Sequence, residues 1–148
     1  MAAVAAPPMM RLTPRPYQHE AVAALLTAAA RGVQRPLLVL PTGTGKTIIF
    51  ALLVQRRGGR ALILAHRDEL IQQAVDKLRL VDPTLRLGVV QADRDEHTAS
   101  TVVASVQTLS RHARLTRLTP DFHTIVIDEA HHADRGRGID YPNLTLII

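Results

Sequence analysis

The segment Pro-Thr-Gly-Thr-Gly-Lys-Thr at residues 41–47 constrains the fold more than any other part of the chain. It lies between an apolar run at residues 37–40 and a stretch of helical character at residues 48–56. Gly43 and Gly45 permit backbone dihedral angles that a side chain would forbid, so successive N–H groups can point inward. The start of the following helix adds a partial positive charge at the same place. A strand, a glycine-rich turn and a helix in this order predict a phosphate-binding loop.

Specific roles in binding a nucleoside triphosphate follow for the residues of this loop. Lys46 is expected to reach the β- and γ-phosphates, and Thr47 to offer its hydroxyl to Mg²⁺. The general pattern has glycine where Leu40 stands, and the alternative is a chance glycine-rich turn. The intact Gly-Lys-Thr at a strand-to-helix junction favours the functional interpretation. The predicted nucleotide-binding residues of the loop are Thr42, Gly43, Thr44, Gly45, Lys46 and Thr47.

A pair of carboxylates follows a second apolar run at residues 124–127. Asp128 suits a residue that holds Mg²⁺, and Glu129 suits one that orients or deprotonates the attacking water. The alternative is a solvated acidic turn. In combination with the phosphate-binding loop, the pair predicts an ATP hydrolase that uses ATP and Mg²⁺.

Apolar runs and helical patterns alternate along the chain. The first predicted helix begins at Pro16 and stops at Gly32. Three further helices are predicted at residues 47–57, 68–80 and 105–112. The predicted strands cover residues 37–40, 61–65, 87–91, 101–106 and 124–127, with a polar loop at residues 92–100. Continuous apolar strands separated by helices predict an α/β fold, a three-layer domain with a mainly parallel sheet. Ligands of such sheets bind at the carboxyl ends of the strands, where both motifs are expected.

Composition limits the possible partners and compartment. The formal charge of +5 suits a polyanionic partner such as nucleic acid, although only Lys46 and Lys77 among the 18 basic residues are lysines. Such an arginine bias also arises from codon usage, so charge alone does not decide. The absence of cysteine excludes disulfides and thiolate metal sites and fits a cytoplasmic location. No apolar run approaches the ~20 residues of a membrane helix, so no membrane partner is expected.

Two adjacent histidines, His131 and His132, follow the carboxylate pair and raise the alternative of a metal site. Their spacing from Asp128 matches no zinc signature. We therefore expect no histidine-ligated metal, and Thr47 and Asp128 stay the predicted metal ligands, for Mg²⁺.

Residues 41–47 and the sequence Asp-Glu-Ala-His at 128–131 together resemble the superfamily 2 helicases, among the DEAD/DEAH-box and type III restriction subunit groups. The resemblance extends from residue 12 to about residue 133. It implies the N-terminal, ATP-binding RecA-like domain of such a helicase. The catalytic residues that it implies are Lys46, Asp128, Glu129 and His131.

Upstream, Arg15-Pro16-Tyr17-Gln18 resembles the family element in which a glutamine recognises adenine. A side-chain amide can pair with both the N6 donor and the N7 acceptor of adenine. The resemblance implies that Gln18 recognises adenine, with Arg15 or Tyr17 packing nearby, and adds Arg15 and Gln18 to the nucleotide-binding residues. The alternative is a glutamine at a helix start that bonds to backbone.

Two further segments resemble motifs with which the family contacts the nucleic-acid backbone. In the first, His66 and Arg67 are the implied contacts, and Arg67 at a helix N-terminus is apt for a phosphate, although it could equally pair with a nearby glutamate. In the second, the hydroxyls of Ser105 and Thr108 are implied to bind phosphate, against the alternative that Ser105 caps a helix.

The resemblance fails in the last part of the chain. These helicases have a second RecA-like domain that supplies an arginine finger, and the Ser-Ala-Thr motif expected after the carboxylate pair is absent. Residues 136–148 resemble a motif of that second domain, which suggests an internal deletion. The alternative is that residues 144–148 are the next strand of the first domain. The expected organisation is a disordered tail at 1–10, the ATP-binding domain at 11–135 and the remnant at 136–148.

The sequence therefore predicts the ATP-binding domain of a nucleic-acid-dependent ATPase or helicase. In the full-length parent, ATP hydrolysis would drive translocation, with DNA expected over RNA. The chain alone is expected to bind ATP with little turnover, because an arginine finger can contribute ~10³–10⁵ in rate. Two alternatives stay open: a non-catalytic fragment that binds nucleic acid or a partner, and a P-loop NTPase unrelated to nucleic acid, which would not respond to DNA or RNA.

Overall fold

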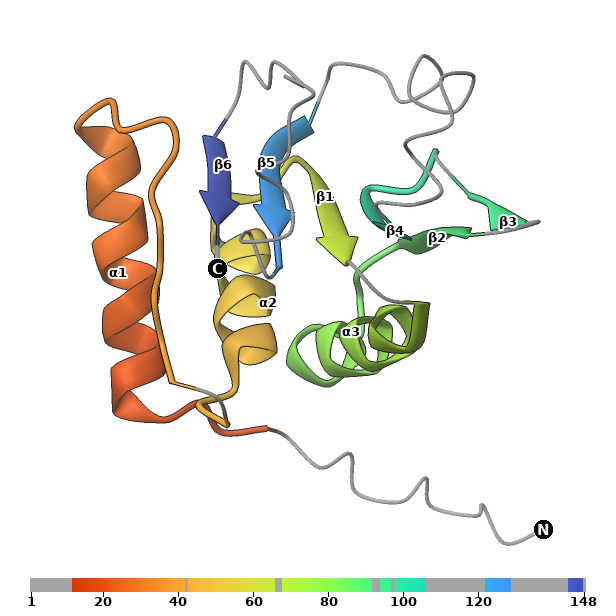
Figure 1. Ribbon diagram of the computed structural model, residues 1–148, viewed down its shortest axis with the longest axis horizontal. Coiled ribbons are helices and arrows are strands. Elements are labelled where there is room, and N and C mark those ends of the chain that lie inside the picture. Colours follow the sequence, from red (N-terminus) through yellow and green to blue (C-terminus); the bar gives the residue numbers. More distant parts are fainter. Residues whose placement is uncertain are drawn as a thin grey trace, which may run out of the picture.

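The computed structural model describes residues 12–41, 43–65, 68–91, 94–96, 98–105, 122–128 and 144–147. Helices and strands alternate along these residues (Figure 1). The helices are α1 (Pro16–Ala30), α2 (Lys46–Arg57) and α3 (Asp68–Val81). The strands are β1 (Arg60–Ala65), β2 (Leu87–Gln91), β3 (Arg94–Asp95), β4 (Thr101–Ser105), β5 (Phe122–Ile127) and β6 (Leu144–Ile147).

The strands form one sheet in the order β3-β2-β4-β1-β5-β6. Every pairing in it is parallel except that of β2 with β3. The arrowheads of β1, β5 and β6 point toward the end of the molecule where α2 begins (Figure 1). The predicted α/β class with a mainly parallel sheet is confirmed, and the carboxyl ends of these strands lie at the end where α2 begins.

Helix α2 lies at the centre of the core. Its residues from Ile48 to Val54 are all buried, and α1 and α3 pack in the same apolar cluster. Burying a large apolar side chain stabilises the fold by about 1.5–3 kcal/mol. The continuous burial explains the unbroken apolar run of this helix, which an amphipathic surface helix would not have. The loop that is predicted to bind phosphate is therefore followed by one of the most deeply buried segments among the described residues.

The two faces of the sheet belong to different clusters. Ala61, Ile63 and Ala65 of β1 pack against the helices, whereas Leu62 and Leu64 belong to a second cluster on the opposite face. All helices of the described ranges contribute to the first cluster. The helix predicted at 105–112 lies outside these ranges except for Ser105. That residue is the last residue of β4, not the first of a helix, because its pairing with Ala65 continues the ladder.

The strand predicted at residues 37–40 is not a strand of this sheet. Only Leu37 forms an isolated bridge, and Leu37 and Val39 are 64% and 78% exposed. Leu38 and Leu40, in contrast, are partly buried against the core. The segment thus packs through alternate side chains. Its apolar composition gave no information about pairing partners, and the position next to β5 is taken by β6.

Strand β6 lies in the last segment of the chain, which is either a remnant of a second domain or the next strand of the first. Leu144–Ile147 pairs in parallel with residues 124–127 of β5. At the level of the backbone, this is the arrangement expected if the segment is the next strand of the first domain. Residues 129–143, which contain most of the proposed remnant, lie outside the described residues, and the origin of the segment stays a hypothesis.

The short strand β3 was predicted as loop. It pairs antiparallel with the end of β2, and Glu96 follows it. The Glu96 carboxylate accepts a hydrogen bond from the Val89 N–H (2.8 Å) and pairs with Arg94 (3.0 Å). The backbone donor foremost, and then Arg94, lower the pKa of Glu96 below its ordinary value.

This lowered pKa predicts a pH-dependent contribution to stability. A carboxyl with a lowered native pKa stabilises the fold above its unfolded pKa, and the contribution is lost as pH falls through the native pKa. Because the Glu96 side chain is 49% exposed, we expect Glu96→Gln to lower the free energy of unfolding at pH 7 by only about 0.5 kcal/mol.

Urea unfolding of both proteins between pH 7 and about pH 3.5 tests this, since the unfolded pKa lies near 4.3. The difference between them should shrink over this interval. The control is Glu20→Gln, because Glu20 is an exposed glutamate on α1. A difference that stayed constant across the pH range would contradict the expectation.

Candidate nucleotide-binding site

The loop before α2 has the backbone conformation that a phosphate-binding turn requires. Gly43 and Gly45 have φ angles of +84° and +73°, in the left-handed region. A residue with a Cβ pays about 1–2 kcal/mol there, which accounts for glycine at both positions. The Thr44 hydroxyl donates to the Pro41 carbonyl (2.8 Å) and closes the turn. Lys46 is the first residue of α2, so the free N–H groups of the helix start lie directly after the turn.

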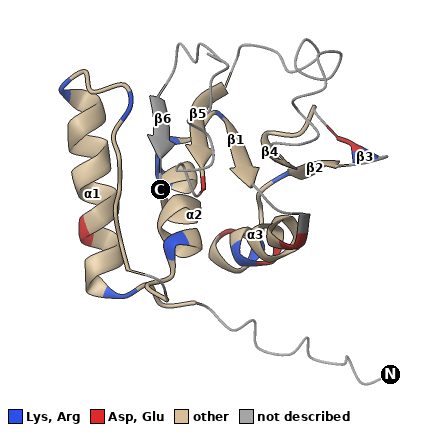
Figure 2. Cartoon of the chain, in the orientation of Figure 1, with Lys and Arg blue, Asp and Glu red and all other residues tan. Residues whose placement is uncertain are grey.

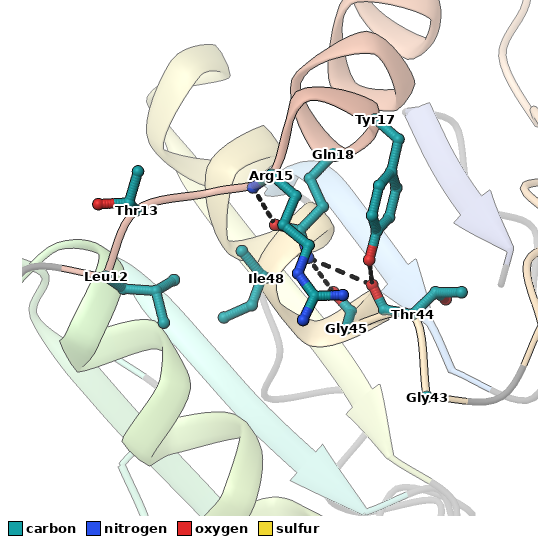
Figure 3. A pocket seen from close by; sticks show the side chains of 9 residues that line it. All are labelled: Leu12, Thr13, Arg15, Tyr17, Gln18, Gly43, Thr44, Gly45 and Ile48. Atoms are coloured by element: carbon teal, nitrogen blue, oxygen red, sulfur yellow. Dashed lines mark hydrogen bonds between the residues drawn. The ribbon is translucent and has the colours of Figure 1, made fainter.

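The start of α1 is bonded to this loop (Figure 3). The Tyr17 hydroxyl donates to the Thr44 carbonyl. The Gln18 Nε2 donates to the same carbonyl (3.2 Å) and to the Gly45 carbonyl (3.5 Å). Two neighbouring side chains of α1 thus bond to two successive carbonyls of the loop.

Gln18 is only 5% exposed, and its amide is bonded at both ends. Its Oε1 accepts a hydrogen bond from the Arg15 N–H (2.8 Å), as the capping alternative expected. Its Nε2 lies so close to the loop that a Cβ on Gly45 would be 2.7 Å away. The contacts with the loop were not predicted, because nothing in the spacing of residues so far apart indicates them. Recognition of adenine by Gln18 stays a prediction.

A cavity of about 320 Å³ lies between the start of α1 and the loop. Its volume is at the lower end of the ~300–1,000 Å³ typical of small-molecule sites. Arg15 and Gln18, both predicted to bind the nucleotide, line it together with Gly43, Thr44 and Gly45. The remaining lining residues are Leu12, Thr13, Tyr17 and Ile48 (Figure 3). Of these, Leu12, Thr13 and Ile48 were not predicted to line the site. Their position next to the two motifs is the only feature of the sequence that could have indicated them.

Asp128 directly follows β5, at the carboxyl edge of the sheet. Its N–H donates to the Leu64 carbonyl (3.1 Å) and extends the ladder between β5 and β1. Lys46 and Thr47, at the start of α2, are half-buried, as is Asp128. The topology therefore places the predicted Mg²⁺ ligands, Thr47 and Asp128, at the same end of the molecule.

Several predicted site residues lie outside the described residues. These are Thr42, Glu129, His131, His66, Arg67 and Thr108. Ser105 is described and is 1% exposed at the end of β4, so its hydroxyl is covered in this structure. Its contact with a nucleic-acid phosphate stays a prediction.

The described ranges contain no group of three or more His, Cys, Asp or Glu residues that could hold a metal ion. None of the helices in these ranges is both long and apolar enough to cross a membrane.

Comparison with known families identifies the chain. Residues 11–145 match the family described as the type III restriction enzyme, res subunit. The chain belongs to this family. It corresponds to the N-terminal ATPase domain of superfamily 2 helicases, as the sequence motifs predicted.

Relatives of this helicase family are much longer than the chain. The IRC3 protein of Saccharomyces cerevisiae, whose name describes it as an ATP-dependent helicase, is 38% identical over 132 residues. The match covers 80% of this chain and 19% of that relative. The chain thus spans about a fifth of the relative's length.

Solved structures show the same fold. The SWI2/SNF2 ATPase core of Sulfolobus solfataricus, solved with double-stranded DNA, matches with a TM-score of 0.73 at 19% identity and covers 99% of this chain and 33% of that one. The T4 protein UvsW matches with a TM-score of 0.68 at 22% identity and covers 92% and 30%. The RecA-like fold is thereby confirmed.

The contact between Gln18 and Gly45 predicts unequal costs for two glycine substitutions. A Cβ at position 43 meets nothing within 4 Å, so Gly43→Ala is destabilised only by its positive φ angle. A Cβ at position 45 must also displace the Gln18 side chain. We expect Gly45→Ala to lower the free energy of unfolding by about 1 kcal/mol more than Gly43→Ala. Urea unfolding of both variants, repeated with Gln18→Ala, measures this. An excess cost that persisted without the Gln18 side chain would contradict the assignment.

Proposed function

We propose that this chain binds ATP with Mg²⁺ and acts as the ATP-binding domain of a nucleic-acid-dependent helicase. The observation that carries the proposal is the loop at residues 43–45, with two left-handed glycines at the start of the buried helix α2 and a cavity beside it. The family, whose IRC3 relative is named as an ATP-dependent helicase, supports the same conclusion.

The residues of the loop suit a triphosphate. Free N–H groups at the start of α2 and the partial positive charge of the helix favour phosphate oxygens at this position. The Lys46 ammonium would neutralise charge on the β- and γ-phosphates. Because Gly43 and Gly45 have no side chains, phosphates can approach the backbone closely at these two positions.

Thr47 and Asp128 fit a Mg²⁺ ion because they offer a hydroxyl and a carboxylate, the hard oxygen donors that this ion prefers. When bound, the ion would neutralise the negative charge that develops during phosphoryl transfer. In this proposal Glu129 orients or deprotonates the attacking water, and His131 completes the Asp-Glu-Ala-His motif of the family.

Gln18, which lines the cavity beside the loop, is the proposed adenine-binding residue, with Arg15 nearby. The Oε1 atom has two lone pairs, and the Arg15 N–H uses one of them. The second lone pair suits the N6 amino group of adenine. The N7 atom would require Nε2 to give up one of its carbonyl contacts, of which the 3.5 Å contact with Gly45 is the longer.

DNA, rather than RNA, is the proposed nucleic acid. The formal charge of +5 suits either nucleic acid, and the double-stranded DNA in the structurally similar SWI2/SNF2 core supports DNA. His66, Arg67, Ser105 and Thr108 would contact its phosphates. With no tryptophan and two tyrosines in the chain, contacts with the backbone should dominate and weaken with salt. Translocation would require a second RecA-like domain, and the chain alone should turn over ATP slowly.

Substitution of the two lysines of the chain tests this proposal. We expect the wild-type chain to bind Mg²⁺·ATP, and Lys46→Ala to weaken binding at least about tenfold because the β- and γ-phosphates lose a charged partner. Lys77→Ala, on α3, should bind as the wild type does. Isothermal titration calorimetry measures the affinities, and a coupled assay measures ATPase rates with and without single-stranded DNA and RNA.

The two assays separate the parts of the proposal. Binding that did not depend on Lys46 would contradict the assignment of the phosphate loop. Turnover that rises with DNA and is abolished by Lys46→Ala would identify a working nucleic-acid-dependent ATPase. Robust turnover that responds to neither nucleic acid would support an NTPase unrelated to nucleic acid instead.

A further inference from the structure

The carbonyl of Thr44 receives two hydrogen bonds from α1. One comes from the Tyr17 hydroxyl and the other from the Gln18 Nε2. A carbonyl oxygen has two lone pairs, so both of its acceptor positions are used. This carbonyl belongs to the peptide group that joins Thr44 to Gly45, in the middle of the phosphate loop.

The direction of this carbonyl determines the direction of an N–H group. A peptide group is planar, and in a trans peptide the C=O and the following N–H point in opposite directions. The described chain has no cis peptide bond. The Thr44 carbonyl faces Tyr17 and Gln18 (Figure 3), and the planar trans peptide therefore directs the Gly45 N–H away from them. The direction of the Lys46 N–H is set in the same way by the Gly45 carbonyl, which accepts bonds from the Ile48 and Ile49 N–H groups of α2 (3.0 and 3.4 Å) as well as the longer contact from Gln18.

Two successive N–H groups directed alike form the kind of concave site that binds an anion. The Lys46 N–H is oriented by α2 itself, whereas the Gly45 N–H is oriented from outside, by two side chains of α1. We propose that Tyr17 is a positioning residue for phosphate binding, whose hydroxyl holds the Thr44–Gly45 peptide so that the Gly45 N–H is directed at the bound phosphate. The inference rests on the proposed binding of ATP.

Tyr17 is better suited to this role than its neighbour. The Gln18 amide also bonds to the Arg15 N–H, and the proposed pairing with adenine draws on the same Nε2 that contacts the loop. Among the described residues, the Tyr17 hydroxyl has no second hydrogen-bond partner, and its phenol is half-buried beside the cavity. When Gln18 turns toward the base, the Tyr17 hydroxyl still holds the Thr44 carbonyl.

The role differs from the one that the family resemblance suggested for Tyr17, which was packing near adenine. A residue that packs on the base affects only ligands that contain a base. A residue that orients the phosphate loop affects every ligand that contains the phosphates. Inorganic tripolyphosphate has the phosphates of ATP without the base, and it therefore distinguishes the two roles.

The test is Tyr17→Phe, which removes one oxygen atom and keeps the ring. We expect the affinities for Mg²⁺·ATP and for Mg²⁺·tripolyphosphate to fall by the same factor, about three- to tenfold, as for the loss of one hydrogen bond. Isothermal titration calorimetry with both ligands measures this at a temperature well below the melting temperature of each variant. Glu20→Gln, an exposed substitution on the same helix, should change neither affinity.

Each other result overturns the inference. A loss confined to ATP would assign Tyr17 to the base. Unchanged affinities with a lower melting temperature would leave the hydroxyl a purely structural role. If the wild-type chain bound neither ligand, the proposed function would fail and the inference with it, whereas wild-type binding that Tyr17→Phe leaves intact would refute the inference alone.

Discussion

The burial of α2 is the constraint on which the rest of the site depends. From Ile48 to Val54 the helix has no exposed side chain, and α1, α3 and one face of the sheet pack in the same cluster. Its first residues, Lys46 and Thr47, are half-buried. A helix held in this way cannot shift without disturbing the core, so its free N–H groups stay in place before any ligand arrives. The rigid end of the helix provides the positive potential, and the glycine loop provides the shape.

Helix α1 completes the site from a different direction. It packs in the same cluster as α2 through Val22 and Leu25, and its first turn reaches the loop through Tyr17 and Gln18. The residue proposed to bind adenine and the loop proposed to bind phosphate are therefore linked by one short helical turn. This link gives a physical reason for the presence of an Arg-Pro-Tyr-Gln element ahead of a phosphate loop. The proline starts the helix, and the next two side chains contact the loop.

Local patterns in the sequence predicted the fold well where one segment decides its own structure. The three described helices, the carboxylate after β5 and the glycine conformations of the loop follow from spacing, capping and steric rules. Pairing partners did not follow: residues 37–40 have the composition of a buried strand, yet Leu37 and Val39 are exposed, and β3 formed where a loop was expected. The contacts of Tyr17 and Gln18 with the loop were also missed, because they join residues that only the packing of α1 on α2 brings together. Such contacts leave no periodic trace in a single sequence.

The strand order β3-β2-β4-β1-β5-β6 has a consequence for how the candidate site is assembled during synthesis. The phosphate loop is made early, but Asp128 emerges only with β5, and β5 must then insert beside β1, which was made much earlier. Non-local parallel pairing of this kind is slow, because the entropy of closing long loops is lost before the contacts form. A nascent chain that already contains the loop still lacks its carboxylate partner. On the ribosome, the two halves of the candidate site can therefore come together only late, after β5 has paired with β1.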